Sequence, residues 1–446
     1  MPHLTQELAQ FIHQLQPGDV PASAVTTVRR GISDCMGVLF AGRNQPVVEH
    51  ALSMVTLSNS PGTARVLGDR GHASAADAAF VNAVAAHALD YDDTGLDGHP
   101  SVVLTPVVLA QAQSLGQNWQ SAITAYVAGY ETWADLIGRD PDKHHGKGWH
   151  PTAVFGAVAC AAASAHLRQL TQEQIGHALG IAASLAGGLV ANFGSMTKPL
   201  QVGWAARNGI IASQLAQQGV SASQDALESP RGFLAALSPQ GQVDLERPCG
   251  AGHPWQIQLQ GLNIKRYPVC YAAHRLIDAT LSLQAHMQHR HKSIEHIDVH
   301  IGHLQAGMLR SSSPQNGLDA KFSAEFAVAC ALTQGHVNLD DLNDANITQA
   351  HIQSLMQLVR IHPVTTQDPG DPLFSPHDQV VIHLRDGSSM SSEPVSKALG
   401  HAQRPIGEAE LHEKFQDCSQ RTLTPSQANQ WWSSCNAPEK EPVRWP

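Results

Sequence analysis

Three segments of small apolar residues restrict the fold of this 446-residue chain more than any other feature of its sequence. Residues 72–89, 152–170 and 201–218 are rich in alanine and glycine and carry few charged side chains. Small side chains let helices approach closely, so we predict that these segments are helices in the middle of a compact helical domain. Only 15% of the residues are charged, against about 25% in ordinary soluble proteins. We therefore expect an extensive buried surface, part of it in a subunit interface.

The pattern of apolar residues changes near residue 263. Residues 297–301 and 380–384 alternate between apolar and polar side chains, which predicts strands, and Asp386-Gly387 predicts a hairpin turn after the second strand. Helical periodicity returns after Pro394 and continues to about residue 415, before a tail that contains prolines and tryptophans. The other elements predicted in this region are a strand at 358–364 and helices at 323–333 and 339–356.

These changes predict the fold class and the domain organisation. We expect a mainly α protein, in which a large all-helical domain is formed by both ends of the chain and a smaller α+β domain is inserted into it. The predicted boundaries are 1–265 for the first part of the helical domain, 266–395 for the inserted domain and 396–446 for the return segment.

Charge and cysteine content exclude several classes of function. The formal net charge is −10, so no basic surface for nucleic acid is expected. No apolar run approaches the ~18 residues that a membrane span needs. The seven cysteines are widely separated, without a CxxC pair, so we expect reduced thiols in a cytoplasmic protein that has no targeting signal.

The first candidate site is the segment from His87 to Thr94, which His99 follows shortly. Asp90, Asp92 and Asp93 lie where an apolar helix is predicted to end, which is the unfavourable end of the helix dipole for carboxylates. Such a group of carboxylates is solvated, is paired with cations, or has raised pKa values suited to acid–base chemistry. A divalent metal site is a rival interpretation of the same aspartates.

Two further motifs lie beside the small-residue helices. His150 precedes Pro151 at the predicted start of the second helix, where free backbone N–H groups favour a bound anion. Lys198 is the single lysine between residues 179 and 206, in a predicted loop at 194–200. Its ammonium either reaches solvent, or is desolvated and binds a substrate carboxylate or acts as a base.

The fourth motif lies at the expected change of domain. Lys265 and Arg266 are adjacent cations and His274 is near a predicted helix start, a combination that suits anion binding in an interdomain cleft. Solvated cations on a connecting segment are the alternative. Six histidines between residues 286 and 303 give only weak metal-ligand spacing, and we interpret them as a solvated helix end that leads to an exposed strand.

Signatures of several common enzyme classes are absent from the sequence. It contains no GxSxG, no GxxxxGK[ST], no GxGxxG after a strand and no HExxH. The serine-hydrolase, P-loop, dinucleotide-binding and zincin classes therefore have no support.

The four motifs resemble those of the MmgE/PrpD family, in the family's order, over roughly residues 25 to 395. The resemblance implies a helical domain built from both chain ends, an α+β lid, and usually a homodimer. It also implies chemistry without a metal or an organic cofactor. The matching stretches are His87–Thr94 with His99–Ser101, Trp149–Thr152, Thr197–Leu200 with Gly203–Ala206, and Lys265–Pro268 with His274 and Ile277–Ala279.

Known activities of the family are 2-methylcitrate dehydration, cis-aconitate decarboxylation and iminodisuccinate epimerisation. A tyrosine of the decarboxylase branch corresponds here to Phe326, and the segment between Thr94 and His99 is one residue shorter. Both departures weaken the assignment to that decarboxylase, and Phe326 places hydro-lyase chemistry slightly ahead of decarboxylation. The active-site positions of the decarboxylase branch correspond here to Asp90, Thr94, His99, His150, Lys198 and His274.

The resemblance and the residues together predict a cofactor-independent lyase that acts on a small di- or tricarboxylate at a carbon next to a carboxylate. We expect protonated histidines and Lys198 to stabilise the developing negative charge. The alternatives are an epimerase of an iminodisuccinate-like substrate and an inactive carboxylate-binding homologue. The predicted roles are proton transfer by His99, His150 and Lys198, orientation by Asp90 and Thr94, and binding of a remote carboxylate by His274 with Lys265 or Arg266.

Overall fold

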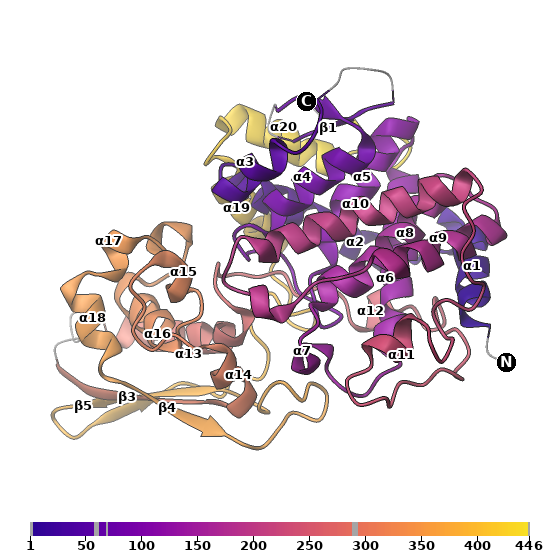
Figure 1. Cartoon of the computed structure of the whole chain (residues 1–446). Coiled ribbons are helices and arrows are strands. Elements are labelled where there is room, and N and C mark those ends of the chain that lie inside the picture. The colour runs from indigo at the N-terminus through magenta and orange to yellow at the C-terminus, as the bar shows by residue number, and fades with distance from the viewer. Residues whose placement is uncertain (1–2, 58–61, 68–69, 288–292, 445–446) are drawn as a thin grey trace. The chain divides into compact units, whose positions relative to one another are not determined.

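The computed structural model describes residues 3–57, 62–67, 70–287 and 293–444. The chain divides into two compact units (Figure 1). Unit 1 comprises Met1–Asn263 and Gly407–Pro446, so it is formed by both ends of the chain, and unit 2 comprises Ile264–Ile406.

Unit 1 is built almost entirely from helices. The predicted mainly α fold is confirmed, but the prediction of an all-helical domain is wrong in one detail, because β1 (Ala64–Arg65) and β2 (His72–Ala73) form a short antiparallel pair. The helices of unit 1 are α1 (Leu4–Gln14), α2 (Ala22–Gly42), α3 (Pro46–Leu52), α4 (Ala75–His87), α5 (Pro100–Leu115), α6 (Trp119–Ile137), α7 (His144–Lys147), α8 (Pro151–Leu167), α9 (Gln172–Leu185), α10 (Thr197–Gln217), α11 (Phe233–Leu237), α12 (Gln256–Leu259), α19 (Glu408–Ser419) and α20 (Pro425–Cys435).

Helices α4, α8 and α10 form the centre of unit 1. In α8 every residue except His166 is buried, which is why this helix has no polar face. Helix α10 packs against both α4 and α8. A Cβ atom on Gly203 would overlap Val84 of α4, and one on Gly209 would overlap the backbone of Cys160 in α8. The glycines of α10 therefore allow the close helix contacts that the small-residue segments predict.

Two predicted helix starts are wrong, and capping explains the first. Helix α4 begins at Ala75 because the Ser74 hydroxyl accepts a hydrogen bond from the Asp77 amide, so the predicted helical residues before it lie outside the helix. Helix α10 begins at Thr197, inside the predicted loop. Lys198 is consequently held on the first turn of a long buried helix, rather than on a loop.

Unit 2 combines a four-stranded sheet with short helices. The strands have the order β4-β3-β5-β6, in which β3 is parallel to β4 and antiparallel to β5. Figure 1 shows the helices α13, α16 and α18 on one side of this sheet. The elements of unit 2 are α13 (His274–Met287), β3 (Ile294–Gly302), α14 (His303–Met308), α15 (Gly317–Ala320), α16 (Ala324–Gln334), α17 (Asp344–Ile347), α18 (Ala350–Met356), β4 (Val359–Val364), β5 (Gln379–Leu384) and β6 (Ser389–Ser391).

Three details of the C-terminal half differ from the prediction. The helix expected at 339–356 is broken into α17 and α18, because Asn343 caps the first and Thr348 ends it. The helical pattern expected after Pro394 begins only with α19 at Glu408, and the tail contains a further helix, α20. Strand β3 has a neighbouring strand on each side, and its polar residues His296, Asp298 and His300 are partly exposed. His289 and His291 lie outside the described residues.

All seven cysteines are free, as predicted, and five of them are buried. Within the described ranges, none of the helices has both the length and the apolar character that a bilayer span requires.

Candidate active site

The turn after α4 positions the first group of candidate residues. Asp90 has a positive φ of 53°, a left-handed conformation that aspartate tolerates better than most residues. This conformation reverses the chain immediately after the helix and precedes two fully buried carboxylates, Asp92 and Asp93. The chain then enters α5, with His99 at its N-cap and Pro100 in its first turn.

Lys198 reaches this turn from the first turn of α10. Its Nζ donates a hydrogen bond to Asp90 Oδ1 at 2.9 Å, and both side chains are largely buried. The ammonium also lies 5.0 Å from the centre of the Phe193 ring. The alternative in which this lysine reaches solvent is therefore wrong for the chain as described.

Asp92 accepts hydrogen bonds from two imidazoles. His87 Nδ1 lies 3.1 Å from both carboxylate oxygens, and His99 Nδ1 lies 2.7 Å from Oδ2 and 2.9 Å from the backbone carbonyl of Asp93. The two rings meet edge to face with their centres 4.7 Å apart. Since a carboxylate only accepts, each imidazole carries its proton on Nδ1 in this arrangement.

His150 is held by a chain of hydrogen bonds from α10. The Gln201 amide donates through Nε2 to the Leu189 carbonyl at 3.1 Å, which leaves its Oε1 as the acceptor for His150 Nδ1 at 2.8 Å. The His150 ring also meets Phe193 edge to face and lies 6.1 Å from the His87 ring, nearly parallel to it. Gln201 thus fixes both the orientation and the tautomer of His150.

The three imidazoles share one arrangement. Each directs its Nδ1 to a fixed acceptor, so its Nε2 carries a free electron pair. Among the described residues, Nε2 of His87 and Nε2 of His150 are buried without a hydrogen-bond partner. Unpaired buried polar atoms are costly, and they mark places where a ligand or water completes the bonding. His99 Nε2 lies 3.9 Å from Asp90 Oδ1.

Burial keeps two of these imidazoles neutral. It lowers the pKa of His87 to about 4, although Asp92 opposes the shift, and it lowers the pKa of His150 well below its usual value, assisted by the positive charge of Lys198. Both imidazoles are therefore neutral near pH 7 in the free protein, and stabilisation of developing charge by protonated histidines stays a prediction. Neutral imidazoles are bases, and a bound anion beside them would favour proton uptake.

The two buried aspartates of the turn differ in charge. Burial disfavours ionisation of Asp92, but the two histidines that hydrogen-bond to it lower its pKa well below the usual value. Burial raises the pKa of Asp93 to about 8, and the hydrogen bonds from Ser101 offset this only in part. Asp93 is consequently a neutral acid at pH 7, in contact with the Ser101 hydroxyl, which lies 2.8 Å from the Tyr126 hydroxyl.

The cluster contains donor atoms of the kind that bind a metal ion. Ligand atoms of His87, Asp90, Asp92 and His99 lie within 4.8 Å of one another. However, the Lys198 ammonium lies 2.9 Å from Asp90 Oδ1, so a metal ion held by Asp90 would lie beside a second positive charge. The residues therefore do not fit a metal ion unless Lys198 moves away. A metal-free site stays a prediction.

The residues predicted from sequence fall into two groups. Asp90, His99, His150 and Lys198 come together around the turn after α4, whereas Thr94 pairs through its backbone with Asn263. Its Oγ1 is buried without a partner in the described part of the chain.

Lys265, Arg266 and His274 belong to unit 2, and their predicted role in carboxylate binding stays a prediction. Within that unit Lys265 and His274 are buried, and the His274 ring contacts the rings of Tyr267 and Tyr271.

Three members of the cluster had no predicted role: His87 and Asp92, which lie in the first candidate segment, and Gln201, which the sequence did not single out. The signal for the first two was the five-residue spacing across a helix end, which lets the imidazole meet the carboxylate. Gln201 follows Lys198 by one turn of α10, so a helix start at residue 197 would have placed both side chains on one face.

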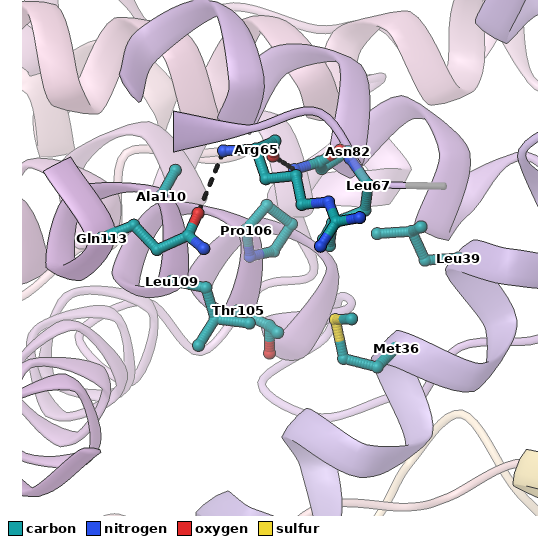
Figure 2. A pocket seen from close by; sticks show the side chains of 10 residues that line it. All are labelled: Met36, Leu39, Arg65, Leu67, Asn82, Thr105, Pro106, Leu109, Ala110 and Gln113. Atoms are coloured by element: carbon teal, nitrogen blue, oxygen red, sulfur yellow. Dashed lines mark hydrogen bonds between the residues drawn. The ribbon is translucent and has the colours of Figure 1, made fainter. Parts of the chain in front are cut away.

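A small cavity in unit 1 lies apart from this chemistry. It is lined by apolar and neutral side chains such as Met36, Leu39 and Thr105, together with Arg65 (Figure 2). Its volume of about 10 Å³ corresponds to about one water molecule. The cavity contains none of the clustered residues and is too small for a di- or tricarboxylate.

Comparisons with known proteins agree with the resemblance. The chain is similar to cis-aconitate decarboxylase from Mus musculus, with 27% identity over 434 residues, which cover 94% of this chain and 87% of the relative. The human cis-aconitate decarboxylase is 26% identical over 94% of this chain and 89% of its own length. The enzyme of the same name from Aspergillus terreus is 26% identical over 92% of this chain and 88% of its own length.

Both domains of one family match. The MmgE/PrpD N-terminal domain matches residues 6–246 and the MmgE/PrpD C-terminal domain matches residues 267–435. With most of its length covered by these two matches, the chain belongs to the MmgE/PrpD family.

Proposed function

We propose that the protein is a lyase that acts on a small di- or tricarboxylate by acid–base chemistry at a carbon next to a carboxylate. One observation carries this proposal. Two neutral imidazoles, those of His87 and His150, present buried and unpaired Nε2 atoms in the cluster that holds the Lys198–Asp90 ion pair. Fixed bases beside a fixed cation are what proton transfer at an acidic carbon requires.

The roles follow from charge and tautomer. His150 and His99 act at Nε2, because their Nδ1 atoms are held by Gln201 and Asp92. Lys198 stabilises negative charge that develops on the substrate, and Asp90 holds its ammonium in place. Thr94 is the proposed donor to a substrate oxygen through its unpaired Oγ1. The free cluster has two carboxylates and one ammonium, so binding of an anion is coupled to proton uptake by the imidazoles.

Decarboxylation is the first reaction that we propose to test. The relatives are named cis-aconitate decarboxylases. Phe326, the reason for placing dehydration first, is fully buried in the core of unit 2, and its amide donates to Ser323 Oγ in the cap of α16. Decarboxylation is nevertheless tested first because it is the activity in the names of these relatives. Dehydration of a 2-methylcitrate-like substrate is the second candidate, because neutral bases beside an ammonium also suit elimination.

A panel of polycarboxylates distinguishes these reactions. Release of CO2 from cis-aconitate identifies decarboxylation, and new absorbance of a C=C bond from 2-methylcitrate identifies dehydration. Deuterium uptake without net conversion of a chiral dicarboxylate identifies an epimerase. If no member of the panel reacts but several raise the melting temperature, the protein is an inactive carboxylate-binding homologue and the proposal is wrong.

We also propose that the protein is a homodimer. Four large apolar side chains are at least 40% exposed within twenty residues of unit 1: Leu185, Leu189, Met196 and Trp204. Exposed apolar groups at this density are typical of association surfaces. Light scattering on the purified chain tests this directly, and a monomer mass at micromolar concentration would contradict it.

A further inference from the structure

A second cluster of titratable side chains lies on the sheet of unit 2, away from its apolar core. Along β3, the buried residues Ile297 and Val299 alternate with the partly exposed residues His296 and Asp298. Strand β5 alternates in the same way and presents His383. Because the apolar residues of both strands join the core of unit 2, these three polar side chains share the opposite face of the sheet.

The strand register brings the three side chains together. His296 is directly opposite His383 in the antiparallel β3–β5 pair, and Asp298 lies two residues further along the same face. His383 Nε2 is 3.1 Å and His296 Nε2 is 3.6 Å from the same atom, Asp298 Oδ2. The two imidazole rings are stacked, with their centres 4.3 Å apart and their planes at 10°. Two nitrogens and one oxygen thus converge on one point.

A third histidine orients the carboxylate from the other side. His362 of β4 contacts Asp298 Oδ1 through Nε2 at 2.8 Å, and its ring stacks on that of His300. Arg360 is the residue paired with Asp298 in the β3–β4 register. His362 therefore holds the Asp298 carboxylate in position through Oδ1, while Oδ2 faces the other two histidines.

We propose that His296, Asp298 and His383 bind a first-row transition-metal dication, with zinc as the best fit. Their ligand atoms all lie within 4.8 Å of one another, so small rotations of the side chains bring each within bonding distance of one ion. Two imidazoles and a carboxylate are a common protein ligand set for zinc, with the fourth position left to water.

Binding at this site has a structural consequence. The ligands come from two strands that are far apart in sequence, so a bound ion links residues 296–298 to residue 383 across the sheet. An ion that binds only the folded chain raises the free energy of unfolding by mass action. His362 is a positioning residue in this proposal, because it acts only through Asp298.

Zinc titration of the metal-stripped, full-length protein tests the proposal. Calorimetry should show that wild type binds one zinc ion per chain at this site, and that His383→Gln and His296→Gln do not bind it. In His362→Asn the ion should still bind, but with an affinity about 10- to 100-fold lower. The matched control is His351→Gln, which removes an exposed histidine of the same unit and should leave zinc binding unchanged. Because the cluster in unit 1 has ligand-like groups of its own, the relevant quantity is the difference in stoichiometry between wild type and variant.

Two further measurements keep the test independent of folding. Circular dichroism establishes that each variant is folded before titration. Cobalt(II) in place of zinc should give visible absorption bands of a low-symmetry, four-coordinate ion in wild type and in His351→Gln, but not in the two ligand variants. Equal zinc stoichiometry and affinity in wild type and in folded His383→Gln would overturn the proposal.

Discussion

The tautomer of His150 is the residue-scale feature that decides the chemistry of the candidate active site. Gln201 donates to the Leu189 carbonyl and can therefore only accept from His150 Nδ1. The electron pair of His150 consequently lies on the unpaired Nε2. A single neutral amide in α10 thus sets which nitrogen acts as the base.

Replacing Gln201 should impair catalysis without unfolding the protein. We expect Gln201→Leu to lower kcat by about 100-fold with little change in KM, because a misplaced base is costly in the transition state. In Gln201→Glu, the added carboxylate should raise the pKa of His150 and shift the acidic limb of the pH–rate profile to higher pH. The matched control is Gln218→Leu, which changes an exposed residue after the same helix. Unchanged kcat in folded Gln201→Leu would contradict this role.

Asp93 predicts a measurable effect of pH on stability. Its pKa is about 8 in the folded protein, whereas an unfolded aspartate has an ordinary pKa near 3.8. Between these values the folded state binds more protons, so this group makes the protein less stable as pH rises, by about 1.4 kcal/mol per pH unit.

In the variant Asp93→Asn the side chain does not ionise, so this residue no longer makes the free energy of unfolding depend on pH. In urea unfolding between pH 5 and pH 8, we expect the free energy of unfolding of Asp93→Asn to increase steadily relative to that of wild type. Parallel stability curves for the two proteins over this range would show that Asp93 is ionised when folded.

Among the residues of the candidate site, the sequence predicted those proposed to react with the substrate better than those that hold the reacting side chains in position. Lys198, His99, His150 and Asp90 belong to motifs whose residue types suggest chemistry. Gln201 is an ordinary residue on a helix, and its importance depends on a hydrogen bond to a residue 51 positions away. Sequence patterns do not carry such long-range pairings, and the same limit hid the convergence of His296 with His383.

Among the elements, α10 connects the core of unit 1 with the candidate site. Its N-terminal turn carries Lys198 and Gln201, and its middle packs tightly against α8 and α4. The centres of the small-residue helices were predictable because these segments are rich in alanine and glycine and carry few charged side chains. Their ends were not, since the start of α10 at Thr197 has no side-chain cap to mark it.

The close contact between α10 and α8 predicts a sharp effect of one added methyl group. A Cβ on Gly209 would overlap backbone atoms of Cys160 and Ala161, which cannot move away as a flexible side chain can. We expect Gly209→Ala to lower the free energy of unfolding by about 2 kcal/mol. The control Gly18→Ala places a methyl group in open space and should change stability by less than about 0.5 kcal/mol. Equal stability of the two variants would contradict the packing described for α10.

For the whole molecule, the mainly α character and the family were both predictable from sequence. The low content of charged residues and the small-residue segments indicated the mainly α character. Four motifs in the family's order along the chain indicated the family. The division into a unit formed by both chain ends and an intervening α+β unit follows the change in periodicity near residue 263. The substrate was not predictable, because related acid–base sites support more than one reaction on similar polycarboxylates.

The proposed function depends on proton transfer by neutral imidazoles of unit 1, beside a Lys198 ammonium that stabilises the negative charge developing on a polycarboxylate. The most direct test is an NMR time course of cis-aconitate in D2O with wild type, Lys198→Ala and the exposed-lysine control Lys440→Ala. We expect wild type and Lys440→Ala to consume the substrate and to incorporate one solvent deuterium on a carbon of the product, at either end of the allylic carbanion that loss of CO2 leaves. We expect folded Lys198→Ala to be at least about 100-fold slower. Equal rates in wild type and Lys198→Ala would contradict the account.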